Sequence, residues 1–216
     1  MFHRLLSGLA LALTTAWSGA HAAAVDVAVT DSRGTPAANA VVSLMPDSGA
    51  ALAAHAASRS VIDQQHETFL PLVVVVRKGG EVVFTNNDVT MHQVYSFSPI
   101  RQFQFELDRG QVSKPVVFDK AGVAAIGCNI HDNMVAYVFV ADAPFAAVTD
   151  AQGHARFADV PDGAWHASVW HPQLRIGRQP ASAALSVSGP QARLALSLPF
   201  AASSMAGMNR MHKTDY

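Results

Sequence analysis

Gly127-Cys128-Asn129-Ile130-His131-Asp132-Asn133-Met134 is the most informative stretch of this 216-residue chain. It lies between two expected strands, Val123 to Cys128 and Val135 to Ala141. A thiol, an imidazole and a thioether stand within seven residues, and so short a segment brings them to one metal ion only as a tight loop. His92 ends a largely apolar run upstream and supplies a second imidazole. Two imidazoles, one thiolate and one thioether are the ligand set of a mononuclear blue-copper site.

Other interpretations of these residues are weaker. A buried inert thiol is common, but Cys128 has His131 and Met134 beside it. A catalytic cysteine usually takes its histidine from a distant part of the sequence, and no third group is apparent, so we expect no catalytic residues and no enzyme. A c-type haem needs two cysteines, and Cys128 is the only one. Met91 is expected to pack in the core, because neighbours on a strand face opposite ways.

The first residues have the pattern of a secretory signal peptide. His3 and Arg4 form a short basic region, Leu5 to Ala16 is apolar, and Ala20-His21-Ala22 is an A-x-A cleavage site. We expect cleavage after Ala22, with Ala23 as the neighbouring option. The apolar run is shorter than the roughly 20 residues of a membrane-spanning helix. The mature protein is therefore expected to be exported and periplasmic, with no membrane span.

The charge balance limits the partners. Without Arg4 the mature chain carries 14 basic and 16 acidic residues. A near-neutral chain with no cluster of lysine or arginine argues against nucleic acid or an anionic membrane as the main partner.

Short strands separated by turn residues predict an all-β chain built of sandwiches. Leu72 to Arg77 and Glu81 to Asn86 are predicted to form a hairpin around Lys78-Gly79-Gly80. A long loop is expected after Phe97. The other expected strands are Val25–Thr30, Ala40–Met45, Val94–Phe97, Val116–Asp119, a strand from Phe145, His154–Phe157, His166–Trp170, Leu185–Val187 and Ala192–Leu198.

Two strand–turn units share a signature, Thr30-Asp31 with Gly34 and Thr149-Asp150 with Gly153. They predict one transthyretin-like, carboxypeptidase-regulatory-like β-sandwich into which a second domain is inserted. Two independent pieces, or N-terminal strands that pair with the inserted domain, are the alternatives. The expected bounds are 1–22 for the signal peptide, 23–60 for N-terminal strands and linker, 61–142 for the inserted domain, 143–198 for the rest of the sandwich and 199–216 for a disordered tail.

The segment from Phe118 to Val138 resembles the last two strands of the cupredoxins, the amicyanin- and plastocyanin-like type 1 copper proteins. Its C-x2-H-x2-M spacing is similar to that of amicyanin, and Phe84-Thr-Asn-Asn-Asp88 before His92 resembles the family's first-histidine segment. The likeness covers residues 61–142 and implies a Greek-key β-sandwich. The sequences His92 to Pro99, Gly127 to Asp132 and Val169-Trp-His-Pro172 also resemble exported proteins labelled methylamine utilisation proteins.

The resemblance implies one type 1 copper ion held by His92, Cys128, His131 and Met134, with the ring edge of His131 at the surface. Gln93 stands where many cupredoxins have the Asn or Ser that ties the two ligand loops together, and Ala136 stands where Gly is common.

The expected function is to carry single electrons between redox partners, such as a cytochrome c or a dehydrogenase, which dock transiently around His131 with Pro99, Phe103 and Phe105. The alternative is a periplasmic copper carrier or scavenger without redox turnover, or a structural sandwich with a degenerate site. A carrier could use Met205, Met208, Met211 and His212 of the tail as a loading site, but an unstructured tail with incidental methionines is the favoured interpretation. His154, His166 and His171 are candidates for a second metal site, with ordinary surface or structural histidines as the favoured alternative.

Overall fold

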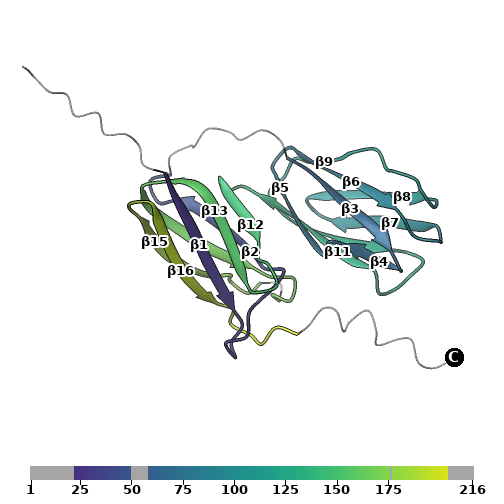
Figure 1. Cartoon of the computed structure of the whole chain (residues 1–216). Coiled ribbons are helices and arrows are strands. Elements are labelled where there is room, and N and C mark those ends of the chain that lie inside the picture. The colour runs from purple at the N-terminus through teal and green to yellow at the C-terminus, as the bar shows by residue number, and fades with distance from the viewer. Residues whose placement is uncertain (1–21, 50–57, 176, 204–216) are drawn as a thin grey trace, which may run out of the picture.

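In this computed structural model the residues described, 22–49, 58–175 and 177–203, form 16 strands and no helix (Figure 1). The prediction of an all-β chain is therefore confirmed. Within those ranges no helix is long and apolar enough to cross a membrane. The expected signal sequence before Ala22, most of the expected linker and the methionines of the tail lie outside the described residues.

The middle of the chain forms a sandwich of two sheets, called here the central sandwich. One sheet has five strands in the order β5-β11-β10-β7-β8, and the other has four in the order β4-β3-β6-β9. Valine and aromatic side chains that alternate along these strands fill the space between the sheets. The strands are β3 (Arg59–Gln65), β4 (Thr68–Leu70), β5 (Val73–Arg77), β6 (Gly80–Asn86), β7 (His92–Ser98), β8 (Arg101–Leu107), β9 (Val116–Phe118), β10 (Gly122–Cys128) and β11 (Val135–Ala141).

The two ends of the described chain meet in a second sandwich, the terminal sandwich, with its own apolar core. Its sheets have the orders β13-β1-β16 and β12-β2-β14-β15. β1 pairs with β13 on one side and runs parallel to β16 on the other. The strands are β1 (Ala22–Thr30), β2 (Val41–Pro46), β12 (Phe145–Val148), β13 (His154–Pro161), β14 (Gly163–Trp170), β15 (Ala181–Val187) and β16 (Gln191–Ser197). The numerical domain bounds given above stay a prediction.

The repeated Thr-Asp signature folds in the same way in both places. Asp31 Oδ1 accepts hydrogen bonds from the backbone N–H groups of Arg33 and Thr35, at 2.8 and 2.9 Å. Asp150 Oδ1 accepts equivalent bonds from Gln152 and His154, at 3.0 and 2.9 Å. In each turn the carboxylate takes the place of a backbone acceptor, which is the physical reason for aspartate at this position.

Gly153→Ala is expected to destabilise the terminal sandwich by about 2 kcal/mol or more, because its φ is +78° and an added Cβ would overlap the carbonyl oxygen of Val29. Gly34→Ala is the matched control, since Gly34 has the same backbone conformation (φ +81°) with no atom within 4 Å of the added Cβ. Its cost should be about 1 kcal/mol. Urea unfolding of both variants measures the difference, and equal losses would show that the overlap with Val29 has no effect.

Two sequence predictions about the central sandwich were wrong. Lys78-Gly79-Gly80 does not close a hairpin, because β5 pairs with β11 in one sheet and β6 pairs with β3 and β9 in the other. The turn residues between two short apolar runs favoured pairing of neighbours in sequence, whereas this turn leads from one sheet to the other. The long loop expected after Phe97 is largely the strand β8, where Phe103 and Phe105 pack against the core and the residues that alternate with them are exposed.

The two sandwiches contact each other through aromatic rings and one arginine. Trp170 of β14 packs against Tyr137 and Phe139 of β11, with 5.7 Å between ring centroids in each pair. Arg77 Nη2 donates a hydrogen bond of 2.5 Å to the carbonyl of Pro144. Burial raises the pKa of the Tyr137 hydroxyl above its ordinary value. The outer face of the five-stranded sheet is thus partly covered by the terminal sandwich.

Low pH is expected to lower the stability of the terminal sandwich, because it protonates three aspartates that are hydrogen-bonded in the folded protein. His154 donates to Asp26 and holds the pKa of that carboxyl below 3.8. Burial alone would raise the pKa of Asp31, but hydrogen bonds led by that from Thr35 lower it, and the backbone bond from His154 lowers that of Asp150. A carboxyl group whose pKa is lowered by folding stabilises the folded protein at pH values above the pKa of the unfolded chain. This contribution is lost as the pH falls through 3.8 toward the lower pKa of the folded protein. Urea midpoints between pH 6 and pH 3 test this, and a constant midpoint would contradict it.

Candidate metal centre

His92 is the first residue of β7, and the alternation of that strand turns its ring into the protein. His92, Val94 and Ser96 are fully buried, whereas Gln93 and Tyr95 lie on the other face. An imidazole with no exposed surface, in a core of valine and phenylalanine, needs polar partners to offset the loss of water. The complete burial of His92 therefore indicates that the fold provides polar partners for its ring.

Cys128 is the last residue of β10 and pairs across the sheet with Val94 of β7, two residues from His92. The chain then turns, and the backbone N–H of Met134 donates to the carbonyl of His131 at 3.2 Å. This turn carries His131 back over Cys128. Cys128 and Met134 are 5% and 3% exposed and belong to the same apolar core.

Three ligand atoms face one point in this pocket. Cys128 Sγ lies 3.7 Å from His92 Nδ1 and 3.9 Å from His131 Nδ1, and the two nitrogens are 3.2 Å apart. A point equidistant from the three atoms is about 2.1 Å from each, close to the roughly 2.0–2.3 Å of metal–imidazole and metal–thiolate bonds. Among the residues described, no other histidine, cysteine or acidic side chains form such a group. Without any rearrangement, the group has the dimensions to hold a single copper ion.

Asp88, four residues before His92, fixes the orientation of that ring. Asp88 Oδ2 lies 3.1 Å from His92 Nε2, and both side chains are almost fully buried. When Nε2–H donates to this carboxylate, Nδ1 keeps its lone pair, which it could donate to a metal ion. Asp88 was not among the predicted site residues, although an acidic residue four positions before a candidate ligand was a visible signal.

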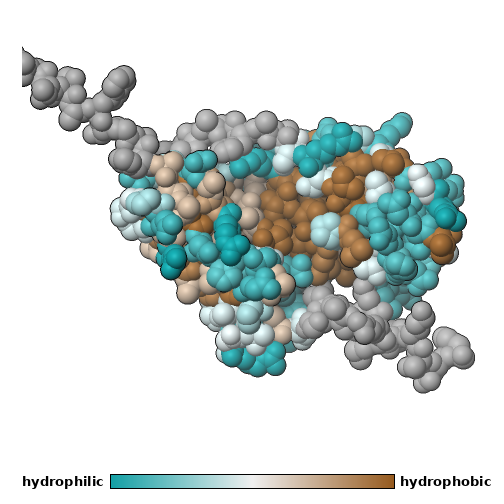
Figure 2. All heavy atoms as spheres, in the orientation of Figure 1, coloured by the Kyte–Doolittle hydropathy of each residue, from teal (hydrophilic) through white to brown (hydrophobic). Residues whose placement is uncertain are grey.

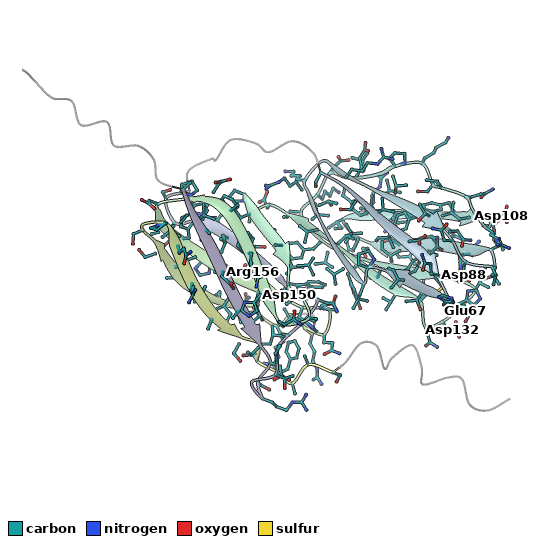
Figure 3. The ribbon with its side chains drawn as sticks, in the orientation of Figure 1. Glu67, Asp88, Asp108, Asp132, Asp150 and Arg156 are labelled. Atoms are coloured by element: carbon teal, nitrogen blue, oxygen red, sulfur yellow. The ribbon has the colours of Figure 1, made fainter. Side chains whose placement is uncertain are left out.

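Backbone groups hold Asp88 in turn. Its Oδ2 also accepts from the N–H of Glu67 at 2.6 Å, and its Oδ1 accepts from the N–H of Val89 at 2.7 Å. Burial alone would raise the pKa of Asp88, but these bonds and the one from His92 keep it below the ordinary value. Asn86 is also buried, and its side chain accepts from the backbone of Asp88. Figure 3 shows Glu67, Asp88 and Asp132 together at one end of the central sandwich.

Gln93 joins the two ligand segments through hydrogen bonds to Asn129. Its Oε1 accepts from Asn129 Nδ2 at 2.7 Å, and its carbonyl accepts from the backbone N–H of Asn129 at 3.0 Å. The residues that follow His92 and Cys128 are therefore bonded to each other twice. The longer glutamine side chain reaches across because its partner is the short asparagine.

His131 is the exposed member of the group. Its side chain is 22% accessible, whereas that of His92 is fully buried. Its Nε2 lies 3.9 Å from the carboxylate of Glu67, a mostly exposed side chain. The two rings meet edge to face with 4.9 Å between their centroids. The His131 ring thus reaches solvent, whereas the His92 ring is held in the core.

Two expectations near the site were wrong. Met91 is 39% exposed, because His92 takes the inward position and its neighbour turns outward. Pro99 lies in the β7–β8 turn, and the register that pairs His92 with Leu107 and Ser98 with Arg101 puts this turn at the opposite end of the hairpin from the ligands. Pro99 is therefore removed from His131.

His154, His166 and His171 do not converge. His154 Nδ1 is 2.7 Å from Asp26 Oδ1, and His166 is exposed on β14. His171 is buried, which lowers its pKa, and its Nδ1 accepts from the backbone N–H of Gln173 at 3.1 Å. These three residues form no metal-binding group in the described part of the chain.

The chain matches no protein-family model, and no curated protein matches its sequence. Solved structures do show similarity. A purple cupredoxin from Nitrosopumilus maritimus matches 38% of this chain over 99% of its own, with 23% identity and a TM-score of 0.34. Amicyanin from Paracoccus versutus matches 49% over 100%, with 20% identity and a TM-score of 0.35. A copper-containing nitrite reductase from Thermus scotoductus matches 43% over 25%, with 22% identity and a TM-score of 0.37.

Proposed function

We propose that this protein is a type 1 copper protein of the cupredoxin family that carries single electrons between redox partners. When bound, copper supplies a one-electron couple between its cupric and cuprous states. His92, Cys128 and His131 would hold the ion, and the thioether of Met134 would be a fourth, weaker ligand. This ligand set is the one that distinguishes blue-copper sites from other copper sites. No substrate chemistry is needed for this role.

The preformed triangle of Cys128 Sγ and the two Nδ1 atoms is the observation that carries the proposal. The two copper oxidation states prefer different geometries, so an electron carrier needs a site that changes little between them. Here Cys128 and His92 belong to paired strands, Asp88 fixes the His92 ring, and Gln93 bonds the two ligand segments together. Each of these contacts opposes movement of the ligands.

The exposed edge of His131 supports transient docking of a redox protein such as a cytochrome c or a dehydrogenase. Val89 and Ile130, next to the ligand segments, are 75% and 46% exposed, and Met91 is also partly exposed. Exposed apolar side chains that adjoin the ligand segments in sequence support a small contact surface, and small contacts are usual in brief redox encounters. Export to the periplasm, based on the signal sequence before Ala22, is part of the same proposal.

A cupric titration of the purified chain, followed by visible absorption and EPR, tests the proposal. One equivalent should give an intense thiolate-to-copper band and a narrow hyperfine splitting. Zinc is the control ion, because it has no redox chemistry and should compete for the site without colour. Fast electron self-exchange, measured by NMR line broadening of mixed oxidation states, should follow. A weak, ordinary cupric spectrum would contradict the type 1 site, and an intense band with slow exchange would favour a copper carrier.

A further inference from the structure

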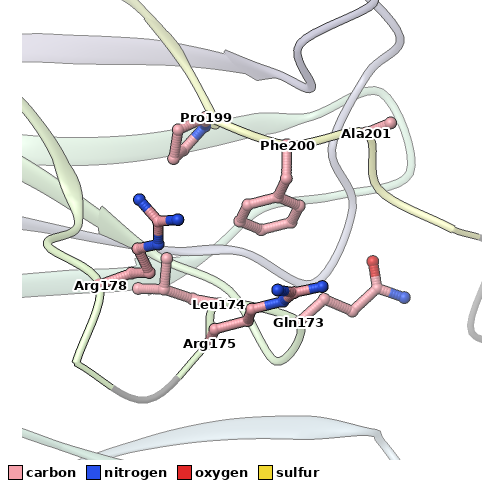
Figure 4. Close-up of a pocket in the computed structure, with 7 residues that line it drawn as sticks. All are labelled: Gln173, Leu174, Arg175, Arg178, Pro199, Phe200 and Ala201. Atoms are coloured by element: carbon pink, nitrogen blue, oxygen red, sulfur yellow. The ribbon is translucent and has the colours of Figure 1, made fainter.

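The terminal sandwich contains a cavity of about 400 Å³ that is far from the metal ligands in sequence. Its walls come from the loop after β14 and from the segment after β16 (Figure 4). Arg175 and Arg178 of the loop bring two guanidinium groups, while Leu174, Pro199 and Phe200 bring apolar surface. A cavity of this size is in the usual range of small-ligand sites, about 300–1,000 Å³.

The apolar wall is held in place by hydrogen bonds to the first turn of the sandwich. The backbone N–H of Ser32 donates to the carbonyl of Phe200 at 3.0 Å. The N–H of Ala202 donates to Asp31 Oδ2 at 3.1 Å, and Asp31 is buried. The Phe200 ring also packs against His171, with 5.8 Å between centroids. Because the Phe200 ring is already held in place, a ligand that binds against it loses little free energy to ordering the site.

Among the residues that the structure describes, no acidic side chain neutralises either guanidinium. Arg175 and Arg178 are both exposed, and across residues 22–49, 58–175 and 177–203 no carboxylate pairs with either of them. The ion pairs of the same sandwich involve Arg33 and Arg156 instead. Two unpaired guanidinium groups around one cavity favour an anion, and their planar donors match a carboxylate best.

We propose that this cavity binds a small organic carboxylate with a flat apolar body. The carboxylate lies between Arg175 and Arg178, and the apolar body packs against Phe200, Leu174 and Pro199. An inorganic anion would use only the arginines and leave the apolar wall exposed to water. The combination of charge and fixed apolar surface is the reason for choosing an organic acid.

Benzoate is the probe, titrated into the purified full chain by isothermal calorimetry and by NMR. Benzamide has the same ring without the charge, and inorganic phosphate has the charge without the ring. Arg175→Gln and Arg178→Gln remove one guanidinium each from exposed positions, so both variants should fold. Arg59→Gln is the matched control, an exposed arginine of β3 in the other sandwich.

Saturable benzoate binding is expected, at least tenfold weaker in each pocket variant and unchanged in Arg59→Gln. Benzamide and phosphate should both bind at least tenfold more weakly than benzoate. Phosphate binding equal to that of benzoate would overturn the organic ligand, and equal benzamide binding would overturn the role of the arginines. Failure to saturate would overturn the site. The same result is expected with and without copper, so this proposal can fail while the proposed electron carrier stands.

Discussion

Cys128→Ser should abolish the intense visible band that cupric ion gives with the wild-type chain, and copper should be bound far more weakly. A serine hydroxyl is protonated at neutral pH and is a hard ligand, so it cannot replace the soft thiolate. Serine keeps the shape of cysteine with a smaller and more polar atom, and Cys128 is buried at the end of a strand, so the fold should survive with a loss of about 1–2 kcal/mol. Absorption and EPR measure the site, and urea unfolding checks the fold.

Met134→Leu is the companion variant, because it removes a buried sulfur with little change in volume. The intense band should persist, since His92, Cys128 and His131 are intact, while the reduction potential should rise with the loss of the thioether. An unchanged potential would show that Met134 is only a core residue. If Cys128→Ser keeps the band, the thiolate is not a ligand and the proposed site is wrong.

Asp88→Asn should weaken copper binding about 10- to 100-fold, the usual effect of removing a hydrogen-bond partner from a metal-ligating histidine. The carboxylate accepts from His92 Nε2 and from the backbone of Glu67 and Val89. An amide can offer only one oxygen, so part of this set of bonds is lost. His92 is then free to adopt the tautomer in which Nδ1 carries the proton.

Asp132→Asn is the matched control, since Asp132 is an exposed carboxylate next to His131. It makes the same change of charge near the metal without touching His92. Competition with a chelator of known affinity measures copper binding of both variants, and circular dichroism confirms that both are folded. Equal weakening in the two variants would mean that Asp88 acts only through its charge.

Local sequence was enough to predict the class of fold and the loop that carries most of the site. Alternating valines and turn residues indicated strands, because side chains on a strand alternate between core and solvent. The spacing of Cys128, His131 and Met134 indicated one metal loop, because seven residues can reach a common point only by turning back. The structure places Cys128 and His131 together and buries Met134 nearby, whose part as an axial ligand stays a prediction.

Pairings between distant segments were decided only by the tertiary structure. The chain around Gly79 leads from one sheet to the other because both sheets of the sandwich need a buried valine face, and a local turn pattern cannot distinguish this from a hairpin. The contact between Asn129 and Gln93 depends on how β10 lies beside β7. The carboxylate of Asp88 becomes a partner of His92 only once both are enclosed by the core. Sequence supplied the ligand types, and the packing of the two sheets set the distances between them.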